Sequence, residues 1–161
     1  MIELPLFLEA FHAHGVEFIV IGGIAARVHG SARVTQDVDV VYARSDANIA
    51  RMVKALAPFN PYLRGAPPNL PFEWSVKTVK AGLNFTLLTT IGSIDVLGEV
   101  VGGGRYEDLA PHSMTETVFG HPAMVVSLPW LIQLKRAAGR VRDFEAIAEL
   151  ELLQDLQKPS S

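Results

Sequence analysis

The sequence contains no cysteine, and this absence excludes several kinds of chemistry at once. Without thiols the chain can form no disulfide, no thiolate metal site and no cysteine nucleophile. It also lacks an uninterrupted apolar run of the ~18 residues that a membrane-spanning helix needs, and it does not begin with the pattern of a signal peptide. We therefore expect a soluble cytoplasmic protein that is not exported and does not act at a membrane.

Positive charge is also scarce, since the 161 residues carry a formal net charge of −3 at pH 7. The overall basic field that draws proteins onto nucleic acids at long range is thus missing, and any contact with RNA or DNA would be local. Apolar residues, in contrast, make up 49% of the chain. This content is enough to bury a core, and we expect one domain over residues 1–161.

The most informative stretch is residues 20–41. An apolar strand precedes Gly22 and Gly23, a short helical stretch follows, and a second strand carries Asp37 and Asp39. Side chains alternate along a strand, so these two carboxylates point to the same side. Neighbouring like charges repel unless a cation neutralises them or one carboxyl stays protonated. Because Mg²⁺ commonly binds one or two carboxylates together with water and substrate phosphates, the pattern predicts a magnesium site.

Gly22 and Gly23 stand where the first strand should end and a helix begin. Glycine lets the backbone turn tightly and brings bare N–H groups toward a ligand. Helix N-termini favour anions, so we expect a phosphate cradle here. Arg33, which lies between the glycines and the aspartates, is the best candidate for a further phosphate contact, because a guanidinium offers a fork of donors. The alternative is that Arg33 pairs with an aspartate or solvates a loop.

A third acid, Asp95, lies inside the apolar segment 93–97, which with residues 83–90 is predicted to form two strands joined by a tight turn. Burying an unpaired carboxylate costs on the order of several kcal/mol, so Asp95 needs a partner. That partner is either a bound cation shared with Asp37 and Asp39 or a structural salt bridge. The spacing alone does not decide between them.

Lys135 falls on the apolar stripe of a helix that begins after Ser127. An inward-facing lysine needs an anion, and we expect either a triphosphate or one of the site carboxylates. The alternative is that its ammonium group reaches out to water, as lysines do easily. Nearby basic residues extend this segment into a local cluster that slightly favours a polyanionic partner: Lys135, Arg136, Arg140 and Arg142.

Two further segments are predicted to be irregular. Five prolines make residues 58–71 a long loop, which would be a lid, part of an acceptor groove or a surface loop without a role. The glycines at 102–104 are not followed by a strand-to-helix fingerprint, so we expect a flexible connection and not a second phosphate loop.

The pattern Gly22-Gly23, thirteen residues, then Asp37-Val38-Asp39-Val40 resembles the signature of the DNA polymerase β-type nucleotidyltransferase superfamily. It is most similar to the small prokaryotic branch that holds minimal nucleotidyltransferases and the AbiEii-like toxin group. Residues 92–97 resemble the strand of the third carboxylate, and residues 134–140 resemble the closing helix. One departure is that many members have Gly-Ser where this chain has Gly22-Gly23, so a hydroxyl that usually touches a phosphate is missing.

The resemblance implies an α/β fold with a mixed, antiparallel-rich sheet and helices packed on one side. The core would cover about residues 1–126 and a C-terminal helical pair about residues 127–157. It also implies that Asp37, Asp39 and Asp95 are catalytic and bind two Mg²⁺ ions, with Asp95 on the side of the attacking hydroxyl. The nucleoside triphosphate would be held through Gly22 and Gly23.

The implied activity is Mg²⁺-dependent transfer of a nucleoside monophosphate from a triphosphate such as ATP to a hydroxyl acceptor. The acceptor would be an RNA 3′ end, a protein or a small molecule. A second hypothesis is a non-catalytic binding partner of toxin–antitoxin type that retains the nucleotidyltransferase fold. A third is a metal-binding fold that takes no nucleotide.

Overall fold

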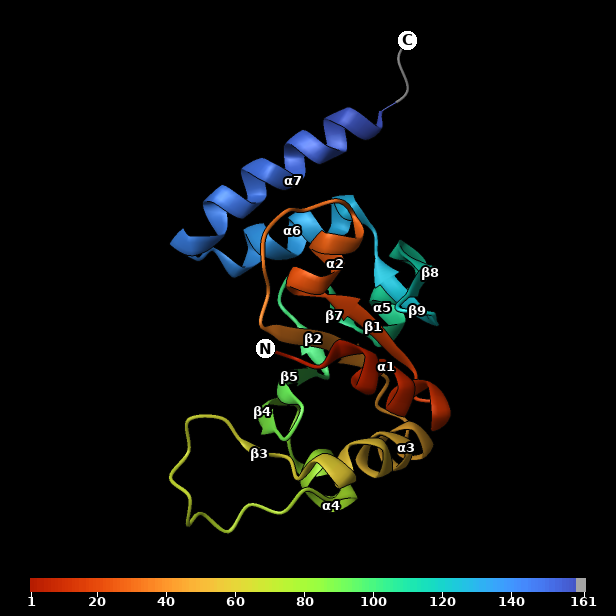
Figure 1. Ribbon diagram of the computed structural model, residues 1–161, viewed down its shortest axis with the longest axis vertical. Coiled ribbons are helices and arrows are strands. Elements are labelled where there is room, and N and C mark those ends of the chain that lie inside the picture. The colour runs from red at the N-terminus through yellow and green to blue at the C-terminus, as the bar shows by residue number, and fades with distance from the viewer. Residues whose placement is uncertain (159–161) are drawn as a thin grey trace.

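A seven-stranded mixed sheet forms the centre of the computed structural model, which describes residues 1–158 (Figure 1). From one edge to the other its strands are β3 (Tyr62–Leu63), β4 (Asn84–Thr89), β5 (Gly92–Leu97), β2 (Asp37–Tyr42), β1 (Phe18–Ile21), β9 (His121–Val126) and β8 (Ser113–Val118). The β1–β9 and β2–β5 pairs are parallel, and the other pairs in this sheet are antiparallel. The expectation of an antiparallel-rich sheet therefore holds only in part, because the pair that carries the three aspartates is parallel.

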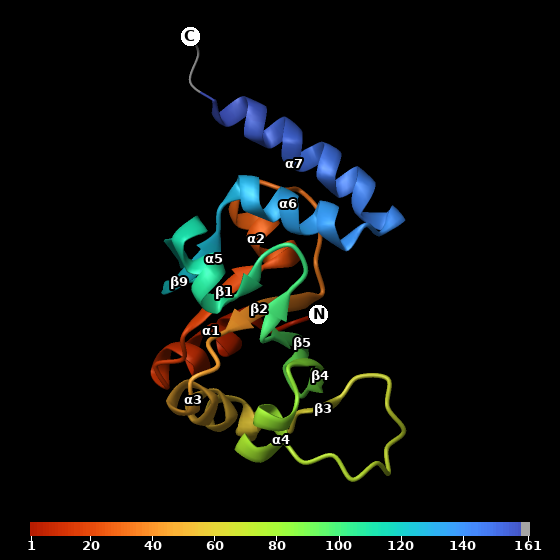
Figure 2. The ribbon, with the colours of Figure 1, turned by 180° about the vertical axis from the view of Figure 1, so that it is seen from behind.

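Helices surround the sheet and follow one another in the order α1 (Leu4–Ala13), α2 (Gly22–Val28), α3 (Asp46–Leu56), α4 (Val76–Ala81), α5 (Tyr106–Leu109), α6 (Leu128–Ala138) and α7 (Phe144–Gln157). Helices α2, α6 and α7 lie toward one end of the molecule, and α3 and α4 toward the other (Figures 1 and 2). Helix α7 is outermost and packs against α6.

The alternation of side chains gives the central strands one fully buried face. Val20 of β1 pairs with Val40 of β2, and Val38 and Val40 pair with Ile94 and Val96 of β5. Paired residues share a face, and all five of these side chains are completely buried. One layer of the core thus lies on the side of the sheet opposite the aspartates.

The prediction that helices pack on one side of the sheet is only partly right. Helix α1 covers the face that carries Phe18, since the Phe11 and Phe18 rings meet edge to face with centroids 5.0 Å apart. Helix α6 lies over the opposite face, where Leu131 lines one cavity together with Ile21 and Asp39. The reason is that β1 and the end of β2 are apolar on both faces and need cover on both.

Both segments predicted to be irregular contain short strands. Tyr62 and Leu63 form β3 at the sheet edge, paired with Leu88 and Leu87, and the rest of the loop projects from the body (Figure 2). Residues 101–103 connect β6 (Glu99–Val100) to β7 (Gly104–Arg105), and the two strands form a separate antiparallel hairpin. Within residues 1–158, no helix combines the length and the apolar character that crossing a lipid bilayer requires.

Candidate functional site

The three aspartates lie on one face of two neighbouring strands. Asp39 of β2 pairs directly with Asp95 of β5, and Asp37 pairs with Ser93. Because alternate residues of a strand share a face, Asp37 stands beside this pair on the same side of the sheet. The register of β2 and β5 therefore brings the three acids together.

Gly22 and Gly23 follow β1 directly and lie beside the acids. Ile21, the last residue of β1, pairs with Asp39, and Gly22 has a φ of 66°, which favours glycine. A Cβ atom on Gly22 would overlap the Asp39 carboxylate. A Cβ atom on Gly23 would lie 2.6 Å from Thr35 Oγ1 and 2.7 Å from Thr35 Cβ. Thr35 thus occupies the space that the serine of a Gly-Ser motif would need.

Asp39 is the most strongly perturbed acid of the site. Burial, and then the negative charges of Asp95 and Asp37, raise its pKa to about 7, against the opposing positive charge of Lys135. Among the described residues, its buried Oδ1 atom has no hydrogen-bond partner. A buried oxygen without a partner, within a group of acids, is a feature that a bound cation would satisfy.

Arg64 is a member of this site that the sequence analysis missed. Its guanidinium group forms an ion pair with Asp95 Oδ1, and its Nη1 atom lies 3.6 Å from Asp37 Oδ2. The partner of Asp95, left open by the sequence, is therefore an arginine in this structure. No local pattern marks Arg64, because it stands in the proline-rich segment and its carboxylate partners lie far away in the sequence.

The donor set fits Mg²⁺, which prefers carboxylate oxygens. Asp37, Asp39 and Asp95 supply three carboxyl groups on one face, and Asp39 Oδ1 is free to accept a ligand bond. In residues 1–158, however, no three His, Cys, Asp or Glu side chains are arranged as a ready metal site. In this structure the Arg64 guanidinium engages two of the three acids, Asp37 and Asp95.

Lys135 faces inward from α6, with 16% of its side chain exposed. Its Nζ atom lies 3.8 Å from Oδ1 of the buried Asp143. It also lines a cavity of about 390 Å³ together with Gly22, Asp39 and Asp95. The structure therefore places Lys135 beside the acids and gives it a protein anion as well.

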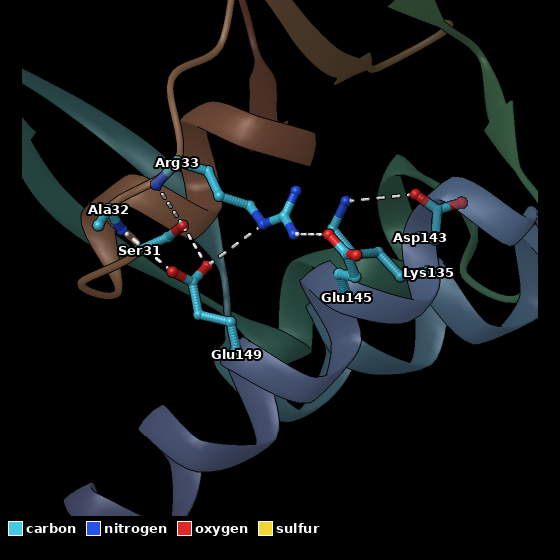
Figure 3. Close-up of polar contacts among 7 residues, drawn as sticks. All are labelled: Ser31, Ala32, Arg33, Lys135, Asp143, Glu145 and Glu149. Carbon is cyan, nitrogen blue, oxygen red and sulfur yellow. Dashed lines mark hydrogen bonds and ion pairs between the residues drawn. The ribbon is translucent and has the colours of Figure 1, made fainter.

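Arg33 points toward α7 (Figure 3). Its Nη2 atom lies 3.2 Å from Glu145 Oε2, and its Nε atom lies 3.9 Å from Glu149 Oε1. It lines a second cavity, of about 300 Å³, that also contains Gly23 and Lys135. Arg33 is thus paired with two glutamates of α7, whereas the alternative interpretation expected an aspartate, and its cavity adjoins Gly23.

Two other basic residues of the local cluster, Arg136 and Arg140, form ion pairs with acidic side chains. Arg136 forms an ion pair with Glu151 on α7. Arg140 Nε lies 2.7 Å from Asp143 Oδ2. These pairs weaken the argument from charge for a polyanionic acceptor.

Comparison with known proteins identifies the fold. No family model matches the sequence, and no relative was found among curated proteins. The structure is similar to "a putative nucleotidyltransferase" from Thermotoga maritima, with a TM-score of 0.58 and 15% identity over 92% of this chain and 94% of the other. It is also similar to an antigenic nucleotidyltransferase-like protein from Paracoccidioides brasiliensis, with a TM-score of 0.57 and 13% identity over 99% of this chain and 80% of the other. The chain therefore has a nucleotidyltransferase-like fold.

Proposed function

We propose that the protein is a Mg²⁺-dependent nucleotidyltransferase that moves a nucleoside monophosphate from a nucleoside triphosphate to a hydroxyl acceptor. The observation that supports this most is the placement of Asp37, Asp39 and Asp95 on one face beside Gly22 and Gly23. The cavity next to these residues has room for a ligand and contains an inward-facing lysine. The nucleotidyltransferase-like fold agrees with this function without determining it.

The side chains have distinct roles in the proposed reaction. Asp37 and Asp39 would hold Mg²⁺ against the phosphates, and Asp95 would complete the site on the side of the attacking hydroxyl. Bound Mg²⁺, with two ions expected, would stabilise the charges on the attacking and leaving oxygens. Asp95 would also receive the proton of the attacking hydroxyl.

The remaining groups would bind the triphosphate. Gly22 lines one of the two cavities and Gly23 lines the other, and their backbone N–H groups would donate to phosphate oxygens. Lys135 lines both cavities, so its ammonium would contribute positive charge to a phosphate chain that passes between them. Arg33 would add a further donor only after leaving its carboxylate partners on α7.

Two observations favour a second candidate, a non-catalytic binding partner of toxin–antitoxin type that retains the fold. A guanidinium already neutralises two of the acids, and Thr35 fills the space of the motif serine. Retention of all three carboxylates favours the enzyme. For either function, we propose that the chain belongs to the small prokaryotic, AbiEii-like branch of the superfamily. This proposal rests on the sequence motif.

The test is a thermal-shift titration with ATP, GTP, CTP and UTP, each with and without Mg²⁺, on the natural protein and on Asp37→Asn. A nucleotide at about a hundred times its dissociation constant adds roughly 2.7 kcal/mol, which corresponds to several degrees in a domain of this size. We expect a Mg²⁺-dependent rise that Asp37→Asn lacks although it remains folded. No shift with any nucleotide would favour the binding partner.

Transfer itself is measured by incubating the protein and Mg²⁺ with a triphosphate labelled at the α-phosphate. Candidate acceptors are RNA with a free 3′ hydroxyl, protein extracts and aminoglycosides. Label that moves to one of these, with release of pyrophosphate, would establish the activity. Binding of a triphosphate without transfer to any acceptor would leave the enzyme proposal unsupported and favour the second candidate.

A further inference from the structure

Arg64 is held on the carboxylate face by backbone pairing. Its N–H group donates to the carbonyl of Thr86, with 3.0 Å between nitrogen and oxygen. Thr86 of β4 pairs with Asp95 of β5, which pairs in turn with Asp39 of β2. Arg64 therefore continues a row of cross-strand neighbours toward the acids, and its position depends on the register of the sheet.

Arg64 and a divalent cation need the same oxygen atoms. The guanidinium engages Asp37 and Asp95, which are two of the three acids that would bind Mg²⁺. Asp39, the third, keeps a buried oxygen without a partner among the described residues. A metal bound by all three acids would place its positive charge beside the guanidinium, which like-charge repulsion disfavours.

The arrangement leaves room for exchange. The Arg64 side chain is 29% exposed, and those of Asp37 and Asp95 are 47% and 21% exposed. Ion pairs with this access to water are weaker than fully buried ones, so a divalent ion can displace the arginine. The segment after Arg64 is held by contacts that do not involve the guanidinium. The Tyr62 hydroxyl donates to the carbonyl of Pro67 and accepts from the N–H group of Leu70.

We propose that Arg64 is an internal counter-ion that competes with the divalent metal for Asp37 and Asp95. This inference rests on the proposed metal site and adds a regulation of it. In the metal-free protein Arg64 offsets the repulsion between the acids. Metal binding releases the Arg64 side chain, so the affinity of the free protein for metal is lower than three clustered carboxylates would otherwise provide.

The first test measures Mn²⁺ binding in the absence of nucleotide, by the loss of the free-ion electron paramagnetic resonance signal. Arg64→Gln should bind Mn²⁺ about tenfold more tightly than the natural protein, because the ion no longer has to displace a charge-assisted contact. Lys80→Gln is the matched control, because it removes one positive charge from a surface ion pair with Asp46 on other elements. It should leave the affinity unchanged.

The outcomes separate the two proposals. If the natural protein and Arg64→Gln bind Mn²⁺ equally, or the variant binds more weakly, the competition is refuted while the metal site stands. If neither binds Mn²⁺, with or without a triphosphate, the metal site and the proposed function fail together. A melting curve of metal-free Arg64→Gln checks that the variant is folded.

The second test follows displacement directly. Trypsin cleaves after an arginine only when the side chain is free to enter its specificity pocket, so pairing with two aspartates should protect the Arg64–Gly65 bond. Saturating Mn²⁺ should speed this cleavage severalfold in the natural protein and much less in Asp37→Asn. Cleavage at the other Lys and Arg bonds in the same digest corrects for effects on trypsin. An unchanged rate at Arg64 would overturn the proposal.

Discussion

Gly23 shows how one residue accommodates another. A side chain at this position would meet Thr35 at distances that real contacts do not reach. We predict that Gly23→Ser destabilises the protein by about 1–3 kcal/mol, the usual cost of overpacking, and that adding Thr35→Gly recovers part of this loss. Chemical denaturation of the single and double variants measures both effects. A fully stable Gly23→Ser protein would show that Thr35 does not block the site.

Asp39 gives the stability of the metal-free protein a pH dependence. Its carboxyl keeps a proton up to a pKa of about 7 in the folded protein, whereas in the unfolded chain it ionises near ~4. Between these two pH values the folded state binds more protons than the unfolded state. The contribution of Asp39 to the free energy of unfolding therefore falls as the pH rises. Urea unfolding with a chelator at pH 5 and pH 8 should show this fall, and Asp39→Asn should reduce it. If the free energy of unfolding fell equally between pH 5 and pH 8 in both proteins, the raised pKa would not belong to Asp39.

At the scale of elements, α7 holds the segment between the glycines and the aspartates. Glu149 accepts hydrogen bonds from the Ser31 hydroxyl and from the Ala32 N–H group, and the Ser31 bond lowers the pKa of this carboxyl (Figure 3). We predict that Glu149→Ala increases hydrogen exchange over residues 31–35. Glu151 lies on the same helix but contacts Arg136, so Glu151→Ala should leave the exchange over residues 31–35 unchanged. If the amides of residues 31–35 exchanged equally fast in both variants, this role of α7 would be contradicted.

Elements with a strong local pattern could be predicted from the sequence. The alternation of Asp37, Val38, Asp39 and Val40 identified β2, and it also placed both carboxylates on one face. The two-residue strand β3 could not be predicted, because its only support is pairing with β4 at the sheet edge. Arg64 was missed for the same reason, since its role depends on register between strands that are distant in sequence.

For the whole molecule, the aromatic contacts of α1 with the sheet are expected to carry much of the stability. Phe11 is fully buried and its ring meets those of Phe7 and Phe18. Phe11→Ala should cost about 3–5 kcal/mol, a large part of the 5–15 kcal/mol typical of a domain. Phe144, which is 61% exposed, provides a matched control whose change to alanine should cost roughly 0.5 kcal/mol or less. Urea denaturation compares the two, and similar losses would contradict this account of the core.

The parallel pairing of Asp39 with Asp95 has a consequence for how related sequences can diverge. A single residue inserted into β5 ahead of Asp95 would turn its carboxylate toward the face occupied by Ile94 and Val96. Insertions and deletions should therefore be rare between the start of β5 and Asp95, while residue types there remain free to change. The projecting chain between Arg64 and α4 has no such constraint, and differences in length should accumulate there.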